Sequence, residues 1–176
     1  MVAEIDYFEK SKVFFKEGDV SATLESYKKV IENLHNQKEH KLEIIEFLTK
    51  IRKYCQENNL IIEEATVLRA LGRTHSKFKN HIEGLKFSYQ ALKIQKKLGK
   101  KQDVAESLEF LAEDLEVSGN YDECIKIFNE ASEIFKDLGN LRKVKEIEKE
   151  ITRLKAFSET IIEDEYLMNK FHVDKY

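Results

Sequence analysis

Apolar residues along this chain recur at intervals of three and four positions in nearly every segment. One face of an α-helix repeats every 3.6 residues, so this spacing predicts a series of amphipathic helices. No segment alternates between apolar and polar residues with a period of two, so no strand is predicted. Three sets show the helical spacing: Ile44, Leu48, Ile51 and Cys55; Phe87, Ala91, Ile94 and Leu98; and Val104, Leu108, Leu111 and Leu115.

Short turn signals separate these apolar runs about every 20 residues, and many of them contain glycine or asparagine. Both residues suit the left-handed conformation that ends a helix. The signals are Gly18-Asp19, the run 35–38, Asn58-Asn59, Lys79-Asn80, Gly99-Lys100, Gly119-Asn120 and Gly139-Asn140. The helices predicted between them span 2–17, 20–36, 40–57, 60–78, 81–98, 102–118, 121–138 and 141–157. Linkers of two to four residues make neighbouring helices antiparallel.

Several of these helices carry two apolar stripes instead of one. On 121–138, one stripe contains Ile125 and Phe128, and a second, offset by one residue, contains Cys124 and Ile127. A helix with two apolar stripes has to pack against neighbours on two sides. Helix 141–157 has a single stripe, as a terminal helix with one solvated face would have. The pattern therefore predicts an all-α solenoid of about eight to nine antiparallel helices over residues 1–157, followed by an extension at 158–176.

Composition agrees with an all-helical chain, because proline is absent, glycine numbers six and 36% of the residues are charged. The net charge of −3 gives no general attraction to nucleic acid. No stretch approaches the ~20 apolar residues that span a bilayer, and the N-terminus lacks the pattern of a signal peptide. Cys55 and Cys124 stand alone within helical segments, which is typical of buried, reduced thiols. These features predict a cytoplasmic protein without a membrane span.

Shifting the chain by 40 residues aligns segments of the second half with one another. Lys79-Asn80 falls on Gly119-Asn120, and Leu98-Gly99 falls on Leu138-Gly139. Together with Leu71-Gly72, Ala91, Ala131 and Tyr121, these residues resemble the tetratricopeptide repeat, in its variety of roughly 40 residues. The resemblance covers residues 60–140 best and implies a superhelix of helical hairpins that binds protein partners. The small residues 72, 91, 112 and 131 are expected where helices approach closely.

The phase of the repeat over residues 1–57 has two interpretations. In the first, Gly18-Asp19 resembles a turn between the two helices of one hairpin. In the second, counting back by 40 residue positions from Gly99 makes it a turn between successive hairpins. The counting argument is preferred here.

The resemblance also implies which residues line the concave groove, because the first helix of each hairpin faces it in this family. Basic residues at i, i+4 and i+8 on one first helix stand beside acidic residues on the next. The predicted partner-binding residues are Lys29 and Asn33; Arg69, Arg73 and Lys77; Glu106, Glu109, Glu113 and Glu116; and Lys149 and Arg153. Two interpretations stay open: the strips pair with each other as surface ion pairs, or they recognise a peptide that carries both charges. The family's clamp for a carboxylate tail is not matched, because Glu106 and Phe110 stand at its later basic positions.

Candidate chemistry is sparse. The chain has no Gly-x-Ser-x-Gly, phosphate-binding loop or His-Glu-x-x-His motif, and its cysteines lack the spacing of a zinc site. No catalytic residue, metal ligand or cofactor is predicted, and the protein is not expected to be an enzyme. His75 is expected to be partly buried, in a position where the family often places an aromatic residue.

A basic patch lies on one helix and its exit. It contains Lys86, Lys93, Lys96, Lys97, Lys100 and Lys101. One interpretation is a surface for nucleic acid or acidic lipid, and the other is a solvated outer face. No aromatic residue is interleaved for stacking against bases, so nucleic acid is not an expected partner.

The extension 158–176 departs from the repeat, being acidic first and then aromatic and apolar. Ser158 could begin a short helix, on which Ile162, Tyr166, Leu167 and Phe171 could form one face. The segment either covers the end of the solenoid or docks in a groove, its own or that of a neighbouring copy, which would give a homo-oligomer. The principal prediction is a scaffold or adaptor that binds a protein or peptide. The alternatives are a self-assembling structural module and a weak binder of nucleic acid or acidic surfaces through the basic patch.

Overall fold

The computed structural model describes residues 6–32, 34 and 40–173, with side chains described as far as Thr160. Eight helices make up the described part of the chain, and it contains no strand. They are α1 (Tyr7–Lys16), α2 (Val20–Glu32), α3 (Lys41–Glu57), α4 (Ile61–Lys77), α5 (His81–Leu98), α6 (Lys101–Val117), α7 (Tyr121–Asp137) and α8 (Leu141–Val173). The predicted all-α fold is confirmed, and α2 to α7 begin within one residue of their predicted starts.

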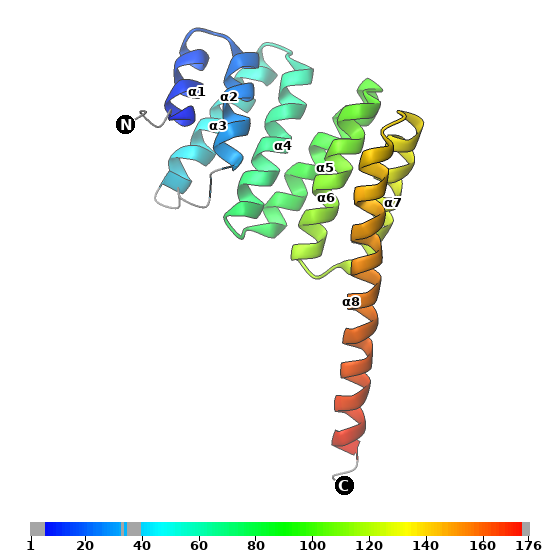
Figure 1. Ribbon diagram of the computed structural model, residues 1–176. Helices are drawn as coiled ribbons and strands as arrows, with labels where there is room; N and C mark the ends of the chain where they lie inside the picture. The colour runs from blue at the N-terminus through cyan, green and yellow to red at the C-terminus, as the bar shows by residue number, and fades with distance from the viewer. Residues whose placement is uncertain (1–5, 33, 35–39, 174–176) are drawn as a thin grey trace, which may run out of the picture.

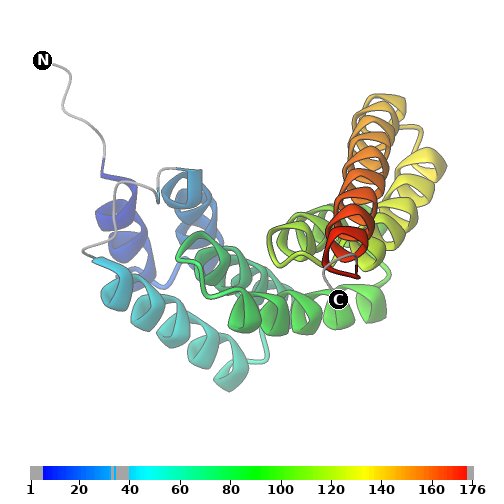
Figure 2. The ribbon, with the colours of Figure 1, turned by 90° about the horizontal axis from the view of Figure 1, so that it is seen from below.

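The helices alternate between two layers of a curved stack (Figures 1 and 2). The inner, concave layer contains α2, α4, α6 and α8, and the outer layer contains α1, α3, α5 and α7 (Figure 2). Within the inner layer, the buried hydroxyls of Tyr27 on α2 and Thr74 on α4 are 2.8 Å apart and hydrogen-bonded. Within the outer layer, Lys96 of α5 pairs with Glu130 of α7 at 2.6 Å. Successive hairpins therefore advance along one axis, as a solenoid requires.

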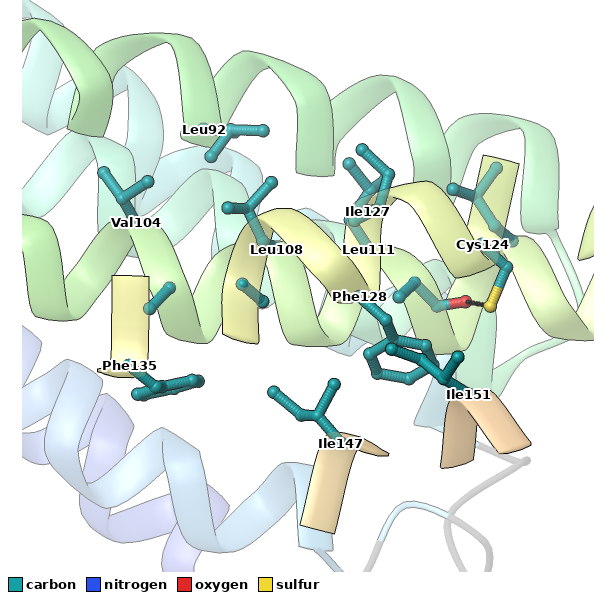
Figure 3. Packing of buried hydrophobic residues seen from close by; sticks show 14 of the residues in the cluster. Leu92, Val104, Leu108, Leu111, Cys124, Ile127, Phe128, Phe135, Ile147 and Ile151 are labelled. Atoms are coloured by element: carbon teal, nitrogen blue, oxygen red, sulfur yellow. Dashed lines mark hydrogen bonds between the residues drawn. The ribbon is translucent and has the colours of Figure 1, made fainter. Parts of the chain in front are cut away.

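The interior divides into two apolar clusters, one at each end of the stack. In the C-terminal cluster, Phe128 and Phe135 of α7 lie between α6 and the apolar stripe of α8 (Figure 3). Cys124 is buried there and its Sγ donates to the Ala112 carbonyl oxygen at 3.1 Å, a distance that shows how closely α6 and α7 approach. Cys55 is buried in the N-terminal cluster, so both cysteines are buried and free, as predicted.

Helices α4 and α5 cross closely at a point where two glycines, Gly72 and Gly84, face each other. A methyl group at Gly72 would collide with the Ser88 hydroxyl, and one at Gly84 would collide with the Ser76 hydroxyl. Either methyl group would also come within 3.1 Å of a carbonyl oxygen of the opposite helix. The small residue at position 72 thus permits direct backbone contact, as the sequence suggested. His75 is buried nearby and stacks on Phe87, with 5.4 Å between ring centroids.

The turns lie where the glycine and asparagine signals predicted them, but one turn differs in which residue is left-handed. Gly119 and Gly139 adopt positive φ angles of 78° and 73°, as a helix-ending residue in the left-handed region does. At the equivalent turn after α4, Lys79 takes this conformation with φ of 61°, whereas Asn80 has φ of −101°. The prediction that asparagine supplies the left-handed residue is therefore wrong at this turn, although Asn59 does supply it after α3, with φ of 53°. The left-handed position after α4 is the one that glycine holds after α1, α5, α6 and α7.

The first two helices satisfy parts of both interpretations of the repeat phase. α2 lies in the same layer as α4, α6 and α8, which is the place that counting back from Gly99 gives it (Figure 2). α1 and α2 nevertheless pack closely as a hairpin, with the buried Ser11 hydroxyl donating to the Thr23 carbonyl oxygen. The start of α1 is set by Asp6, whose carboxylate accepts from the Phe8 and Glu9 amides.

The last helix is about twice as long as predicted. It was expected to end at residue 157, with a short helix or tail after it, but α8 continues without a break to Val173. The physical reason is that residues 141–173 contain no glycine or proline, and Ser158 alone does not stop a helix that is already formed. The buried stripe of α8 is the predicted one, with Ile147, Ile151 and Leu154 in the core.

Candidate functional site

The inner layer carries three hollows that run side by side across the concave face. The first has a volume of about 450 Å³ and lies between α2, α4 and α6; we term it the α2–α4 pocket. The central pocket, of about 140 Å³, lies between α4 and α6 and includes the start of α5. The α6–α8 pocket, of about 370 Å³, lies between α6, α7 and α8. Arg73, Lys77 and Phe110 line both the first and the second, and Glu113 lines both the second and the third, so the three form one groove.

The α2–α4 pocket combines an apolar base with a basic majority among its charged groups. Tyr27 and Leu24 are buried, and the Tyr27 hydroxyl is already bonded to Thr74, so these side chains present mainly carbon to the pocket. The charged residues that line it are Lys28, Arg69, Arg73 and Lys77, with Glu32 and Glu106. The pocket is therefore suited to an apolar side chain flanked by acidic groups.

Two arginines of α4 differ in how their charge is balanced. Arg69 pairs with Glu106 of α6 at 3.4 Å. Arg73, one turn later, has its guanidinium carbon 3.7 Å from the centroid of the Phe110 ring. Across the described residues, no carboxylate lies within 4 Å of the Arg73 guanidinium. Burial lowers the pKa of Arg73, and the charges of Glu113 and Asp114 oppose this change. Arg73 is thus a cation positioned by the Phe110 ring, and the N–H groups of its guanidinium can donate hydrogen bonds to a ligand.

Two acidic residues of α6, Glu113 and Asp114, line the central pocket opposite Arg73 and Lys77 of α4. Glu113 is exposed to solvent but sits inside the concavity, where the surrounding protein raises its pKa; Arg73 acts in the opposite direction. Asp114 is buried, accepts from the Ser88 hydroxyl at 3.4 Å, and also has its pKa raised by burial. The buried Nδ1 of His81 lacks a protein partner within this part of the structure. The central pocket is consequently polar.

The α6–α8 pocket has the opposite charge balance to the α2–α4 pocket. Five acidic residues and one lysine line it: Glu109, Glu113, Glu116, Glu146, Glu150 and Lys149. Four of these carboxylates are already paired with basic residues of α8: Glu109 with Lys143 at 2.7 Å, Glu116 with Arg153 at 2.8 Å, Glu146 with Arg142 at 2.9 Å and Glu150 with Arg153 at 2.8 Å. The groove as a whole therefore changes from basic to acidic between α2 and α8.

The structure brings most of the predicted groove residues onto this one face. The predicted residues that line its pockets are Arg69, Arg73, Lys77, Glu106, Glu109, Glu113, Glu116 and Lys149. Arg153 does not line a pocket but forms an ion pair with Glu116, which does. Lys29 is exposed and pairs with Glu32 at 3.1 Å, while its neighbour Lys28 is the lysine that lines the α2–α4 pocket. Asn33 lies outside the described residues. The interpretation as ion pairs applies to Arg69 and Arg153, each of which pairs with a carboxylate of α6. Recognition of a peptide that carries both charges stays a prediction.

Sequence reasoning missed several groove residues. The missed residues that contribute to the groove or to its ion pairs are Tyr27, Lys143 and Glu146. Phe110 was named only as a departure from the carboxylate clamp, yet it lines two of the pockets. Phe110 stands four residues after Glu106, on the same helical face, so the spacing that selected Glu106 also indicated Phe110. For α2, the absence of a clear repeat alignment left the register uncertain by one residue.

The basic patch lies on and just after α5 in the outer layer, away from the groove (Figure 2). Three of its lysines are paired: Lys86 with Glu83, Lys96 with Glu130 and Lys101 with Asp137. Lys93, Lys97 and Lys100 are exposed. Half of the patch is thus neutralised by its neighbours, which favours the interpretation as a solvated outer face.

Among the residues that the structure describes, no helix is long and apolar enough to cross a membrane. The same residues hold no cluster of three or more histidine, cysteine, aspartate or glutamate side chains placed to bind a metal ion.

Comparison with known proteins supports the repeat assignment. Residues 63–137 match the family model of the tetratricopeptide repeat, within the range 60–140 where the sequence resemblance was strongest. Similar solved structures include a candidate kinesin light chain from Podosopora anserina with nearly identical TPR-like repeats (12% identity, 86% of this chain and 94% of that chain, TM-score 0.49). A single-residue variant of that protein is also similar (11% identity, 88% of this chain and 95% of that chain, TM-score 0.48). Among curated proteins, none matches the chain significantly.

Proposed function

We propose that this chain, whose residues 63–137 match the tetratricopeptide repeat model, is a non-catalytic binding module that holds a segment of a partner protein in its concave groove. The observation that carries the proposal is the groove itself, three adjoining pockets whose lining changes from basic to acidic. The bound segment carries acidic residues over the α2–α4 pocket and basic residues over the α6–α8 pocket, with an apolar side chain against Phe110.

The ion pairs already present in the groove are compatible with this role. Partly exposed pairs such as Arg69–Glu106 and Arg153–Glu116 contribute only ~0–1 kcal/mol each. A ligand that offers its own charges can replace them at little cost. Arg73 needs no such exchange, because Phe110 holds its guanidinium while leaving it without a carboxylate partner in the described structure. We therefore assign Arg73 as the principal anchor for an acidic group of the ligand.

A peptide array tests the proposal directly. The peptides carry an acidic block, two apolar residues and a basic block, and scrambled peptides of the same composition serve as controls. We expect the ordered peptides to bind and the scrambled ones to bind more weakly. Arg73→Glu and Glu113→Lys should each weaken the ordered peptides at least about tenfold, since each reverses a charge inside the groove.

Matched variants on the outer layer give the comparison. Lys93→Glu on α5 and Glu133→Lys on α7 make the same charge changes at exposed outer-layer positions. The proposal fails if all four variants bind the peptides equally well, or if ordered and scrambled peptides bind alike.

A further inference from the structure

The second half of α8 leaves the solenoid as a projecting helix. Leu154 is buried in the C-terminal cluster, and the helix then runs on to Val173 beyond the ends of its neighbours (Figure 1). Residues 158–173 of this projection are about 24 Å long at ~1.5 Å per residue. We refer to residues 158–176 as the tail segment.

The tail segment cannot occupy the groove of its own chain while α8 stays intact. The first half of α8 is itself the end wall of that groove, with Glu146 and Lys149 lining it and Ile147 fixed in the core. A straight helix that begins as the wall cannot turn back across the face it borders. Residues 141–173 contain no glycine or proline at which a reversal would be easy. Any groove that receives the tail segment therefore belongs to another molecule.

The length of the projection matches the width of the groove. The groove crosses four inner helices, α2, α4, α6 and α8. Packed helices lie ~8–10 Å apart, so three spacings amount to about 24–30 Å. A helix of about 24 Å can therefore reach across all three pockets.

The order of charges along the tail segment complements that of the groove. Its first part, residues 158–165, carries four acidic residues and no basic one: Glu159, Glu163, Asp164 and Glu165. Its second part, residues 166–176, contains Lys170, His172 and Lys175 with the single acid Asp174. The first part thus suits the α2–α4 pocket with its four basic side chains, and the second suits the α6–α8 pocket with its five acidic ones. In the sequence, apolar residues at 161, 162, 166, 167 and 171 recur with helical spacing, as a helix facing the apolar base of the α2–α4 pocket requires.

From these relationships we infer that the chain associates with a second copy of itself, and that the tail segment of each copy lies in the concave groove of the other. The inference rests on the proposed function, since it assigns an occupant to the same groove. Reciprocal exchange gives a closed, twofold-symmetric dimer in which each copy donates one helix and receives one. A peptide ligand competes with the tail segment for the groove. In the dimer, the groove of each copy is therefore already filled by the tail segment of the other.

Charge exchange in the full-length chain tests this arrangement. The groove variant carries Arg69→Glu and Arg73→Glu, and the tail variant carries Glu163→Lys, Asp164→Lys and Glu165→Lys. Sedimentation equilibrium over a concentration series should show a dimer for the natural sequence. Each variant alone should raise the dimer dissociation constant at least about tenfold, and a chain that carries both sets should recover most of the affinity.

Further controls keep the outcome decisive. Circular dichroism establishes that each variant is folded, and the tail variant changes only residues beyond the described core. Lys93→Glu with Lys97→Glu changes the charge of the outer layer by the same amount as the groove variant and should leave the dimer intact. A dimer that neither variant weakens overturns the inference, as does a natural chain that stays monomeric throughout the series. Failure here is distinct from failure of the proposed function, because the block-charge peptides can be tested on the tail variant, whose altered tail no longer competes for the groove.

Discussion

The guanidinium of Arg73 lies over the ring of Phe110, with 3.7 Å between the guanidinium carbon and the ring centroid. The two residues belong to neighbouring inner helices, α4 and α6, and both line the α2–α4 and central pockets. The contact ties two repeats together and at the same time presents a cation to the groove. Packing, and under the proposed function recognition of the ligand as well, thus depend on the same pair of side chains.

A double-mutant cycle measures the strength of this pair. Arg73→Gln removes the charge and Phe110→Leu removes the aromatic face, while both replacements keep much of the original volume. A cation over an aromatic ring in a partly desolvated site contributes about 0.5–2 kcal/mol, so we expect a coupling free energy of that size from urea unfolding. The pair Lys93→Gln with Phe110→Leu, whose members lie in different layers, should show almost none. A coupling energy indistinguishable from zero for Arg73 and Phe110 would contradict the assigned contact.

The crossing of α4 and α5 gives a second prediction. Gly72→Ala places a methyl group against the Ser88 hydroxyl and close to the Gly84 carbonyl oxygen. Overpacking of this kind costs about 1–3 kcal/mol, and the better helix propensity of alanine returns up to about 1 kcal/mol. We expect a net loss of about 1–2 kcal/mol in the free energy of unfolding, measured by urea denaturation. Adding Ser88→Ala removes the colliding hydroxyl, so the double variant should lose less than the sum of the single losses. Strict additivity would show that the helices do not meet at this point.

The turn after α4 gives a stabilising prediction. Lys79 has a φ angle of 61°, in the left-handed region that costs a residue with a side chain about 1–2 kcal/mol. Lys79→Gly should therefore raise the free energy of unfolding by about 0.5–1 kcal/mol, after allowance for the greater freedom of glycine in the unfolded chain. Lys100→Gly is the control, because Lys100 has a φ of −81° and gains nothing from glycine. The prediction is wrong if the two variants change thermal and urea stability in the same direction and by equal amounts.

The periodicity of apolar residues was sufficient to predict the layers of the fold. Residues such as Ile44, Leu48, Leu108 and Leu111 recur with helical spacing and are all fully buried in the structure. Burial dictates this pattern residue by residue, so it can be read from the sequence. The end of α8 could not be predicted in this way, because the change in pattern after residue 157 reflects a change in what the helix packs against and not the end of the helix.

The sequence predicted the charged residues of the groove wherever those residues recur with helical spacing. Arg69, Arg73 and Lys77 lie one turn apart on α4, and the structure places all three on the concave face. Whether a given charge is paired could not be foreseen, because pairing depends on the distance between helices. Spacing alone gives no sign that Arg69 meets Glu106 while Arg73 meets a ring. On α2, the choice between Lys28 and Lys29 depended on a register that only packing against Thr74 and α1 determines.

Asp114 leads to a prediction about pH. This carboxyl is buried between α6 and α5, with Ser88 and His81 facing it from α5 and Ser76 and Arg73 from α4. Burial raises its pKa above the ordinary value of 3.8, and the hydrogen bonds and the charge of Arg73 offset only part of this effect. A carboxyl with a raised pKa in the folded state favours folding most when it is protonated, and this contribution is lost as pH rises from the unfolded value through the folded one.

Asp114→Asn removes the loss of stability that ionisation of this carboxyl causes, because asparagine stays neutral at every pH. The stability of the variant relative to the natural chain should therefore increase as pH rises from below 3.8 through the raised pKa of Asp114, and should then level off. Urea unfolding at a series of pH values measures the difference, with the exposed Asp122→Asn as the matched carboxylate control. Repeating the series with His81→Gln in both chains removes the charge of that histidine from the environment of Asp114. A relative stability of Asp114→Asn that falls with rising pH would mean that the ionised carboxylate stabilises the fold, and that Arg73 outweighs the cost of burial.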